Sequence, residues 1–482
     1  MNLRSIVCLF LVLMMGAGLG FAQSGASGGS RDAGSAPSDG ESSGESGSGD
    51  AGMDFGFDLG LGVQTFEDPA TGESQTYQQL SLRPDIALGK FGIGVNVQLH
   101  YRFVPEEDGD GTKLEIRKED WVPAEEQRDF QGVVALYLPK IDYVRWAQKG
   151  DPLFAKFGSI DNSTLGNGFI MGNYSNMQFL PDRRILGLNL DVDGRLFDFP
   201  YVGVETAIGN IAAWDVLGFR LFGRPILFLD VPIVKNLEVG TTFVRDGDPY
   251  YHAVRDPDFT GDPPEDTSVG IWGLDYQLPL LSSQIFTLAQ FGDFVVQGDA
   301  TGGMLGIGGT AFGFMPYGAQ LRFLGDDFIP VYFDSTYDLY RVEKYMVYSD
   351  DPSVPEVEGH VGYFASLGFS FLEDRIVFTA GIDGPIGETA GVAPQVTGGL
   401  TIGRGLIPGF SAQANYTKQD IAEWADFASL DDSVIDARIN YQTGPAVISL
   451  VYKLRYDPFT DETSQDDPWV VTSGLETSIS LF

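Results

Sequence analysis

The chain has 482 residues, a formal net charge of −37 and a single cysteine, Cys8. So acidic a composition argues against a nucleic-acid-binding protein, because phosphate backbones are bound by basic surfaces. One cysteine allows neither a disulfide bond within the chain nor a cysteine-based metal centre. Mean hydropathy is −0.03, far too polar for a bundle of membrane helices.

The N-terminal residues have the pattern of an export signal. Arg4 precedes an apolar run from Ile6 to Met15, and small residues lead to Gly20-Phe21-Ala22. The run is shorter than the about 20 residues of a spanning helix, which favours a cleaved leader over a membrane anchor. We therefore expect residues 1–22 to be a signal peptide. Residues 23–52 are nearly all Gly, Ser, Ala, Asp and Glu, which predicts a flexible periplasmic linker.

From residue 53 onward the sequence predicts long amphipathic strands. Between Phe91 and Phe103 every odd position is apolar and every even position is glycine or polar. Alternation of this kind gives a strand one apolar face, and the stretch exceeds the about 9–11 residues with which a tilted strand crosses a bilayer. Further strands are expected at 55–65, 77–88, 434–442, 446–456 and 469–482, with tight turns at Gly89-Lys90 and Thr443-Gly444-Pro445.

The connections between these strands alternate in length, short and then long. The long ones are expected at Pro105–Arg128, Asp246–Thr267, Glu343–Gly359, Lys418–Asp432 and Asp457–Asp467. We therefore expect residues 53–482 to form an all-β, transmembrane antiparallel β-barrel of about 16–20 strands, with short periplasmic turns and long extracellular loops. Both chain ends would lie in the periplasm, which requires an even strand number, and Ser268–Phe328 leaves that parity open.

A soluble β-sandwich or propeller is the rival fold. Strands of this length, an aromatic outer face and the near absence of a helical pattern favour the barrel. No blade repeat of about 40–50 residues is visible, which argues against a propeller.

Over residues 54–482 the chain resembles bacterial outer-membrane β-barrel proteins of the porin-like kind. The resemblance rests on the leader, the repeated amphipathic strands and the C-terminal Phe482. It implies that Phe482 is a barrel-insertion signal, that the partners are outer-membrane lipid and the barrel-insertion machinery, and that the protein resides in the outer membrane. Phe482 is out of step with the apolar face of Leu475, Ile479 and Leu481, which departs from the family pattern. The segment from Phe157 through Asn176 resembles a stretch of spirochaete-type envelope barrels.

Charged and polar residues opposite the apolar faces are candidates for lining the lumen. Arginine facing lipid would cost about 2–4 kcal/mol at the bilayer midplane, which places such residues inside. Either these charges form an eyelet that sorts solutes by a transverse field, or they pair with one another and merely fill a polar lumen. The pore-lining candidates are Asn96, Gln98, His100, Arg102, Asp191, Asp193, Arg220, Arg322, Asp436, Arg438, Lys453 and Arg455.

The segment Ser159–Pro181 breaks the strand alternation. It combines three glycines with polar residues and the apolar Phe169, Ile170 and Met171. A plain surface loop is the favoured interpretation, and a loop folded into the lumen as a constriction is the alternative. The constriction candidates are Asp161, Asn167, Tyr174 and Asn176.

Enzymatic and metal-binding functions are not expected. The histidines His100, His252 and His360 match no zinc motif, and Ser366 and Ser370 lie near His360 without a motif for nucleophilic catalysis. An acidic loop offers oxygen ligands for Ca²⁺ but lacks EF-hand spacing, so we interpret it as a solvated loop. Its members are Asp246, Asp248, Asp256, Asp258, Asp262, Glu265 and Asp266. No cofactor and no metal are expected.

These observations favour a porin-like channel for passive passage of small hydrophilic solutes. The alternative is a surface-exposed structural or adhesion barrel whose extracellular loops bind a partner. A transporter of apolar molecules is disfavoured by Arg102, Arg220 and Arg438 in the expected lumen. The solute, the selectivity and the oligomeric state, including a homo-oligomer, stay open.

Overall fold

The computed structural model describes residues 53–480, apart from short gaps, and describes only the backbone of the first and last strands. The gaps are 68–73, 106–111, 124–132, 134–135, 180–182, 230, 256–262, 265–266, 373–374, 388, 390–391, 419–420, 422–425, 427–432, 444–445 and 457–468. The expected signal peptide, linker and insertion signal Phe482 lie outside the described residues, as do nearly all of the loops at 418–432 and 457–467.

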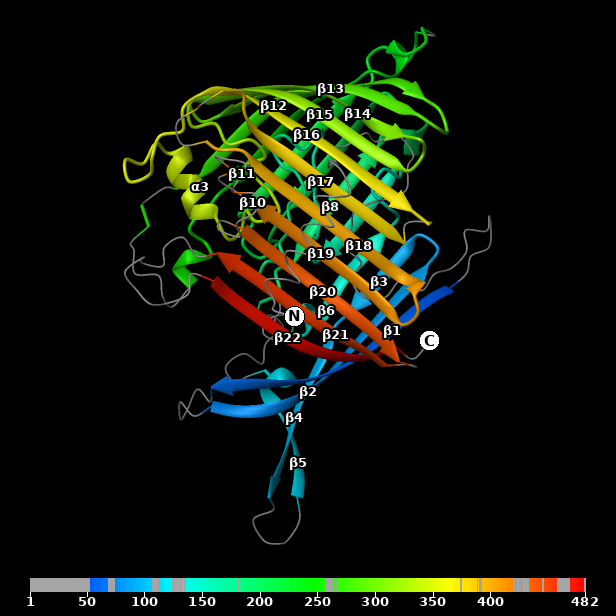
Figure 1. Ribbon diagram of the computed structural model, residues 1–482, viewed down its shortest axis with the longest axis vertical. Coiled ribbons are helices and arrows are strands. Elements are labelled where there is room, and N and C mark those ends of the chain that lie inside the picture. Colours follow the sequence, from blue (N-terminus) through cyan, green and yellow to red (C-terminus); the bar gives the residue numbers. More distant parts are fainter. Residues whose placement is uncertain are drawn as a thin grey trace.

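The chain forms one antiparallel sheet in which nearly every strand pairs with the next one along the sequence (Figure 1). The strands are β1 (Met53–Glu67), β2 (Ser74–Leu88), β3 (Phe91–Val95), β4 (Val97–Pro105), β5 (Thr112–Ile116), β6 (Ile141–Trp146), β7 (Leu153–Gly158), β8 (Gly187–Asp193), β9 (Val202–Ile208), β10 (Val216–Gly223), β11 (Glu238–Asp246), β12 (Val269–Ser282), β13 (Thr287–Gln297), β14 (Ala300–Ala311), β15 (Met315–Leu324), β16 (His360–Phe371), β17 (Ile376–Pro385), β18 (Gln395–Ile407), β19 (Phe410–Lys418), β20 (Ser433–Thr443), β21 (Ala446–Tyr456) and β22 (Trp469–Ser480).

The first and last strands pair and make the sheet a closed ring. The register runs from Asp58 opposite Ser480 to Leu61 opposite Thr477. The 22 described strands occupy 20 positions around the ring. β3 and β4 follow one another along the same edge of β2 and share one position, and β5 and β6 share the next one, because β5 pairs with β4 and β6 pairs with β3. An even number brings the start of β1 and the end of β22 to the same end of the barrel. Closure gives the first and last strands a partner on both edges, so their backbone groups are not left unpaired in hydrocarbon, where this is costly.

The two faces of the ring differ as the alternation predicts. On β14 the side chain of Leu305 points outward and is 50% exposed, whereas its neighbour Met304 points inward and is 2% exposed. Phe294, Phe323 and Leu450 repeat the outward pattern on other strands. A belt of exposed aliphatic and aromatic side chains around a closed antiparallel ring identifies a transmembrane β-barrel.

The two barrel ends carry different connections. We call the end where β1 starts and β22 stops the turn end, and the opposite end the loop end. The loop end carries the long segments 159–186, 247–268 and 325–359, the last containing the helix α3 (Arg341–Tyr348). Among the described strands the alternation of short and long connections fails in three places: the loop-end turn at 298–299 is tight, and the turn-end segments 194–201 and 224–237 are long.

Several expected boundaries are corrected. The stretch Phe91–Phe103 is interrupted at Asn96, whose backbone N–H donates to the Lys140 carbonyl instead of to the ladder (2.7 Å). The expected loop Pro105–Arg128 contains strand β5, and the expected loop Glu343–Gly359 begins inside α3. Ser268–Phe328 contains the four strands β12 to β15, which settles the parity. No helix in the described part of the chain is long and apolar enough to span a membrane.

An arginine scan tests which face meets lipid. Leu305→Arg should lower the free energy of unfolding in lipid by about 2–4 kcal/mol, because the charge would enter hydrocarbon. Asn415→Arg, on the inward face of β19, should change it by within about 0.5 kcal/mol. Urea titration in phospholipid vesicles measures both, and equal costs would contradict the assigned faces.

Candidate functional site

One wall of the lumen is covered by two segments that fold inward from the loop end. The first inner loop, residues 159–179, connects β7 to β8, and its side chains of Leu165, Phe169 and Met171 are buried. The interpretation of this segment as a plain surface loop is therefore wrong. The second inner loop, residues 325–340, precedes α3 and buries Phe328 and Phe333.

The two inner loops are joined to each other by backbone hydrogen bonds. The N–H of Phe333 donates to the carbonyl of Ile170 (3.0 Å), and the N–H of Gly172 donates to the carbonyl of Phe333 (3.1 Å). The N–H of Val331 donates to the carbonyl of Phe169 (2.9 Å). This short parallel ladder makes the two loops one unit, although about 160 residues separate them in sequence.

This unit packs on an apolar patch of the barrel wall. The wall contributes inward side chains from β10 to β15, namely Val216, Val244, Val269, Ile271, Phe291, Val295, Met304 and Leu324. Glycines in the wall make room for it: a Cβ at Gly218 would lie 2.7 Å from Leu165 Cδ1, and a Cβ at Gly302 would lie 2.5 Å from the Phe328 ring. The covered wall is therefore shaped for these two loops.

Polar side chains of the first inner loop bind the same wall. The Asn167 amide donates to the Asp293 carboxylate (2.9 Å) and to the Tyr276 carbonyl (3.2 Å). The Asn176 amide donates to the Gly209 carbonyl (2.9 Å). Of the four constriction candidates, Asn167, Tyr174 and Asn176 are buried in such contacts, whereas Asp161 is exposed and pairs with Lys156 (2.7 Å).

Beneath the first inner loop lies a network of ion pairs around two arginines. Arg220 is 3% exposed and contacts carboxylates of Asp275 (3.0 Å), Glu238 (3.2 Å) and Glu205 (3.4 Å). Arg224 contacts Glu238 (3.0 Å) and Asp193 (2.8 Å). The N–H of Gly166 donates to Glu205 (3.1 Å), which ties the network to the loop. The pore-lining candidates Asp193 and Arg220 thus meet in a network that fastens the loop.

The other pore-lining candidates lie in separate groups. His100 contacts Asp120 (2.7 Å) and Arg102 contacts Glu115 (3.1 Å), both at the β4–β5 hairpin. Asp191 contacts Lys149 (3.2 Å), and Arg322 contacts Asp383 (3.6 Å). Asn96 and Gln98 lie where β3 meets β4, Asp436 and Arg438 lie on β20, and the side chains of Lys453 and Arg455 lie outside the described residues. Where these partners are described, each charge is paired with a residue of a nearby strand or turn, and the pairs do not meet at one place.

The wall formed by β17 to β20 has the opposite character. Register carries the inward face from Arg322 on β15 through Phe364 and Asp383 to Gln395 on β18. Besides the exposed Val434, the inward residues that follow are polar and are half-buried or exposed, in contrast to the fully buried apolar wall. They are Gln395, Thr397, Thr401, Ser411, Gln413, Asn415, Thr417, Asp436, Arg438 and Asn440. The lumen thus has one apolar wall that is covered and one polar wall that is open.

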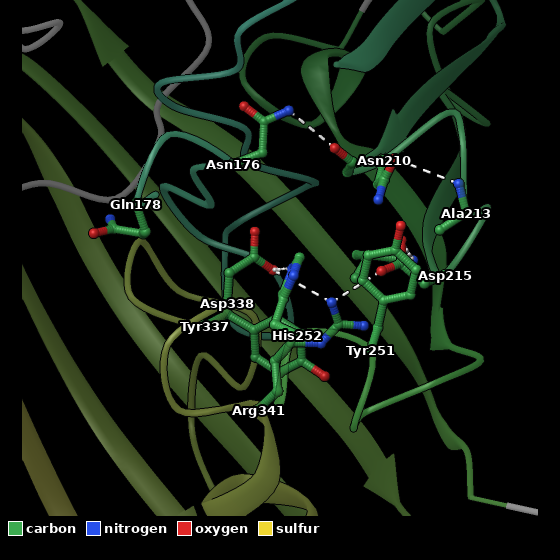
Figure 2. Close-up of polar contacts among 12 residues, drawn as sticks. Asn176, Gln178, Asn210, Ala213, Asp215, Tyr251, His252, Tyr337, Asp338 and Arg341 are labelled. Atoms are coloured by element: carbon green, nitrogen blue, oxygen red, sulfur yellow. Dashed lines mark hydrogen bonds and ion pairs between the residues drawn. The ribbon is translucent and has the colours of Figure 1, made fainter. Parts of the chain in front are cut away.

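A buried ion-pair cluster lies at the loop end above the inner loops (Figure 2). We call it the Arg341 cluster, formed by Asp215, Asp246, His252, Asp338 and Arg341. The Arg341 guanidinium donates to Asp215 (2.9 Å) and to Asp246 (3.0 Å). Tyr174 of the first inner loop donates its hydroxyl to Asp338 (3.2 Å), and Tyr337 donates to Asp246 (2.6 Å). The cluster joins four loop-end segments, and the sequence pattern did not reveal it. Asp246 was expected in a solvated loop, which is corrected.

Two titratable groups of the cluster have shifted pKa values. Burial raises the pKa of Asp338 from 3.8 to about 7, against the pull of Arg341. Burial lowers the pKa of His252 from 6.5 to about 2, and the charges of Arg341 and Arg183 add to this. Arg183 donates to His252 Nδ1 (3.0 Å), so that nitrogen accepts and the ring proton sits on Nε2, which faces Asp338 at 3.9 Å.

No protein-family model matches the chain, and no curated protein matches it. Among solved structures it is similar to OpdQ of Pseudomonas aeruginosa, with 10% identity over 89% of this chain and 96% of that one and a TM-score of 0.32. It is also similar to OccAB1 of Acinetobacter baumannii (9% identity, 89% and 95% covered, TM-score 0.29). The ferric enterobactin receptor PfeA of Pseudomonas aeruginosa is a third (10% identity, 90% and 74% covered, TM-score 0.38). Likeness this slight assigns the chain to no group.

The two pKa shifts predict opposite pH dependences for two variants. Between about pH 4 and 7 the folded cluster holds a proton on Asp338 that the unfolded chain has lost, so this group stabilises less as pH rises. Between about pH 2 and 6.5 the unfolded chain holds a proton on His252 that the folded cluster lacks, so this group stabilises more as pH rises. In the native protein the two slopes, each up to about 1.4 kcal/mol per pH unit, largely cancel from pH 4 to 6.5.

His252→Gln should therefore make the free energy of opening of residues 325–348 fall as pH rises from 4 to 7. Asp338→Asn should make it rise from pH 4 to 6.5. Hydrogen exchange corrected for intrinsic rates measures both in vesicles, with a β14 peptide as the internal control. Slopes of the same sign in the two variants would refute the assigned protonation states.

Proposed function

We propose that the protein is an outer-membrane, porin-like channel for passive passage of small hydrophilic solutes. The passage runs between the inner loops and the polar wall formed by β17 to β20. The observation that carries this proposal is the contrast between the two walls. The wall with inward valine, isoleucine and phenylalanine is covered, and the wall with inward serine, threonine, asparagine and glutamine is accessible.

The physical reason is hydration. Hydroxyl and amide groups form hydrogen bonds with water, so a polar wall can face water without a penalty. Contact between water and an apolar wall costs free energy, so an apolar wall is covered. Barrels of about 16–18 strands already enclose an aqueous channel, and the described ring is larger. The inner loops then act as the constriction, with Asn167, Tyr174 and Asn176 holding it against the wall. Asp193 and Arg220 support it from beneath, and Asp436 and Arg438 line the passage.

The remaining parts of the proposal concern delivery to the membrane. Residues 1–22 direct export, residues 23–52 link to the barrel on the periplasmic side, and Phe482 engages the barrel-insertion machinery. The turn end would then face the periplasm and the loop end the exterior. These assignments rest on sequence patterns alone.

Thiol modification of single-cysteine variants tests the passage. In a Cys8→Ser background, Asn415→Cys places a thiol on the open wall, and Val295→Cys places one beneath the inner loops. A bulky methanethiosulfonate reagent should lower the single-channel conductance of Asn415→Cys in planar bilayers by at least about one third and leave Val295→Cys unchanged. The loss of about one third is expected because the attached group narrows the proposed passage.

Both variants should conduct equally before the reagent is added. A block at Val295→Cys with none at Asn415→Cys would place the passage on the wrong wall. Absence of conductance steps from correctly folded, heat-modifiable barrel would contradict the channel itself.

A further inference from the structure

The turn end carries an exposed apolar projection where β8 and β10 end and β9 and β11 begin. We call it the apolar foot, formed by residues 194–201 between β8 and β9 and by the described residues 224–229 and 231–237 between β10 and β11. Phe197 is 69% exposed and Phe228 is 67% exposed. Other exposed apolar residues of the foot are Leu196, Phe199, Leu229, Val231, Ile233 and Val234. Turn-end connections in barrels are short, so a long apolar one requires an explanation.

The two segments of the foot are held together in a defined structure. The Arg224 N–H donates to the Tyr201 carbonyl (2.7 Å), and the Arg224 guanidinium donates to the Pro200 carbonyl (3.0 Å). The same guanidinium is fixed by Asp193 and Glu238 on the inner face of the barrel. Backbone hydrogen bonds at Leu229 and Lys235 order the longer segment. The apolar side chains are thus presented by a built scaffold.

The charge of the foot differs from that of the rest of the chain. Its two segments carry three basic residues, Arg195, Arg224 and Lys235, and two acidic ones, Asp198 and Asp230, whereas the whole sequence carries 30 basic and 67 acidic residues. The loop-end segments, in contrast, are densely acidic, as the run Asp256 to Asp266 illustrates. A segment that combines exposed apolar side chains with basic ones and has no net negative charge has the composition of an interfacial membrane segment.

The foot is also continuous with the lipid-facing surface. Gly223, the last residue of β10, pairs with Val202 on β9 and with Val239 on β11, and both valines are exposed on the outside. Above them, Phe219 and Leu221 of β10 face outward and are exposed. Exposed apolar surface of this extent marks an interaction site, and here it extends an existing surface for lipid.

We propose that the apolar foot lies in the bilayer interface at the turn end and that its partner is lipid. It inserts Phe197 and Phe228 among the acyl chains and headgroups and sets the depth at which the barrel sits. This inference rests on the transmembrane barrel and does not depend on channel activity. A protein partner or a second copy of this chain would cover the same residues from water but not expose them to lipid.

A single environment-sensitive label distinguishes these occupants. In a Cys8→Ser background, Phe228→Cys and Phe197→Cys are each labelled with a nitrobenzoxadiazole dye. The full chain is then reconstituted at less than one barrel per vesicle into phosphatidylethanolamine–phosphatidylglycerol vesicles. Leu305→Cys provides the lipid-exposed control and Ser353→Cys, at the loop end, provides the water-exposed control. Quenching by doxyl-labelled acyl chains and by iodide is measured for all four.

At both foot positions we expect doxyl quenching at least half of that at Leu305→Cys, and iodide quenching at most one third of that at Ser353→Cys. Iodide quenching equal to the Ser353→Cys value would overturn the proposal, because the foot would lie in water. Shielding from both quenchers would also overturn it, in favour of a protein contact. The labelled variants should conduct normally, so that neither quenching result bears on the channel proposal.

Discussion

Every backbone polar group that lies in hydrocarbon must find a partner within the protein. This constraint explains why β1 and β22 meet, and why twenty strand positions share one continuous ladder. It also determines where side chains go, because each strand then has one face toward lipid and one toward the lumen. Only an apolar surface is stable against lipid, so polar and charged side chains are confined to the lumen face. The passage proposed above accordingly lies in the lumen, whereas the apolar foot belongs to the outer surface.

The interior is divided between packing and water. A ring of this size encloses more space than wall side chains alone can fill. Along β10 to β15 the chain fills that space with its two inner loops, which bury phenylalanines, tyrosines and aliphatic residues as a soluble core does. Along β17 to β20 it leaves polar residues accessible. The Arg220 network and the Arg341 cluster fasten the packed half at two depths.

Local pattern predicts the parts of this architecture that depend on neighbours in sequence. Alternation placed Phe91, Leu99 and Tyr101 on one face, and it placed Arg220 opposite Leu221, as the structure has them. It did not reveal that Asn167 binds Asp293, or that Arg341 binds Asp215, since each pair is separated by 126 residues. Such partners are set by how the ring closes and how far the inner loops reach, and neither leaves a periodic trace in a single sequence.

The missing alternation in Ser268–Phe328 has a structural cause. Strand parity was unreadable in Ser268–Phe328, and this is where β12 to β15 have apolar residues on both faces: Ile271 and Phe291 inward, Trp272 and Phe294 outward. A strand buried on both faces loses its alternation because both environments exclude water. In a barrel sequence, loss of alternation over consecutive strands is therefore the signature of a wall covered by an inner loop. The aromatic cluster of Phe328, Tyr332, Phe333 and Tyr337 directly after β15 supplies the covering segment.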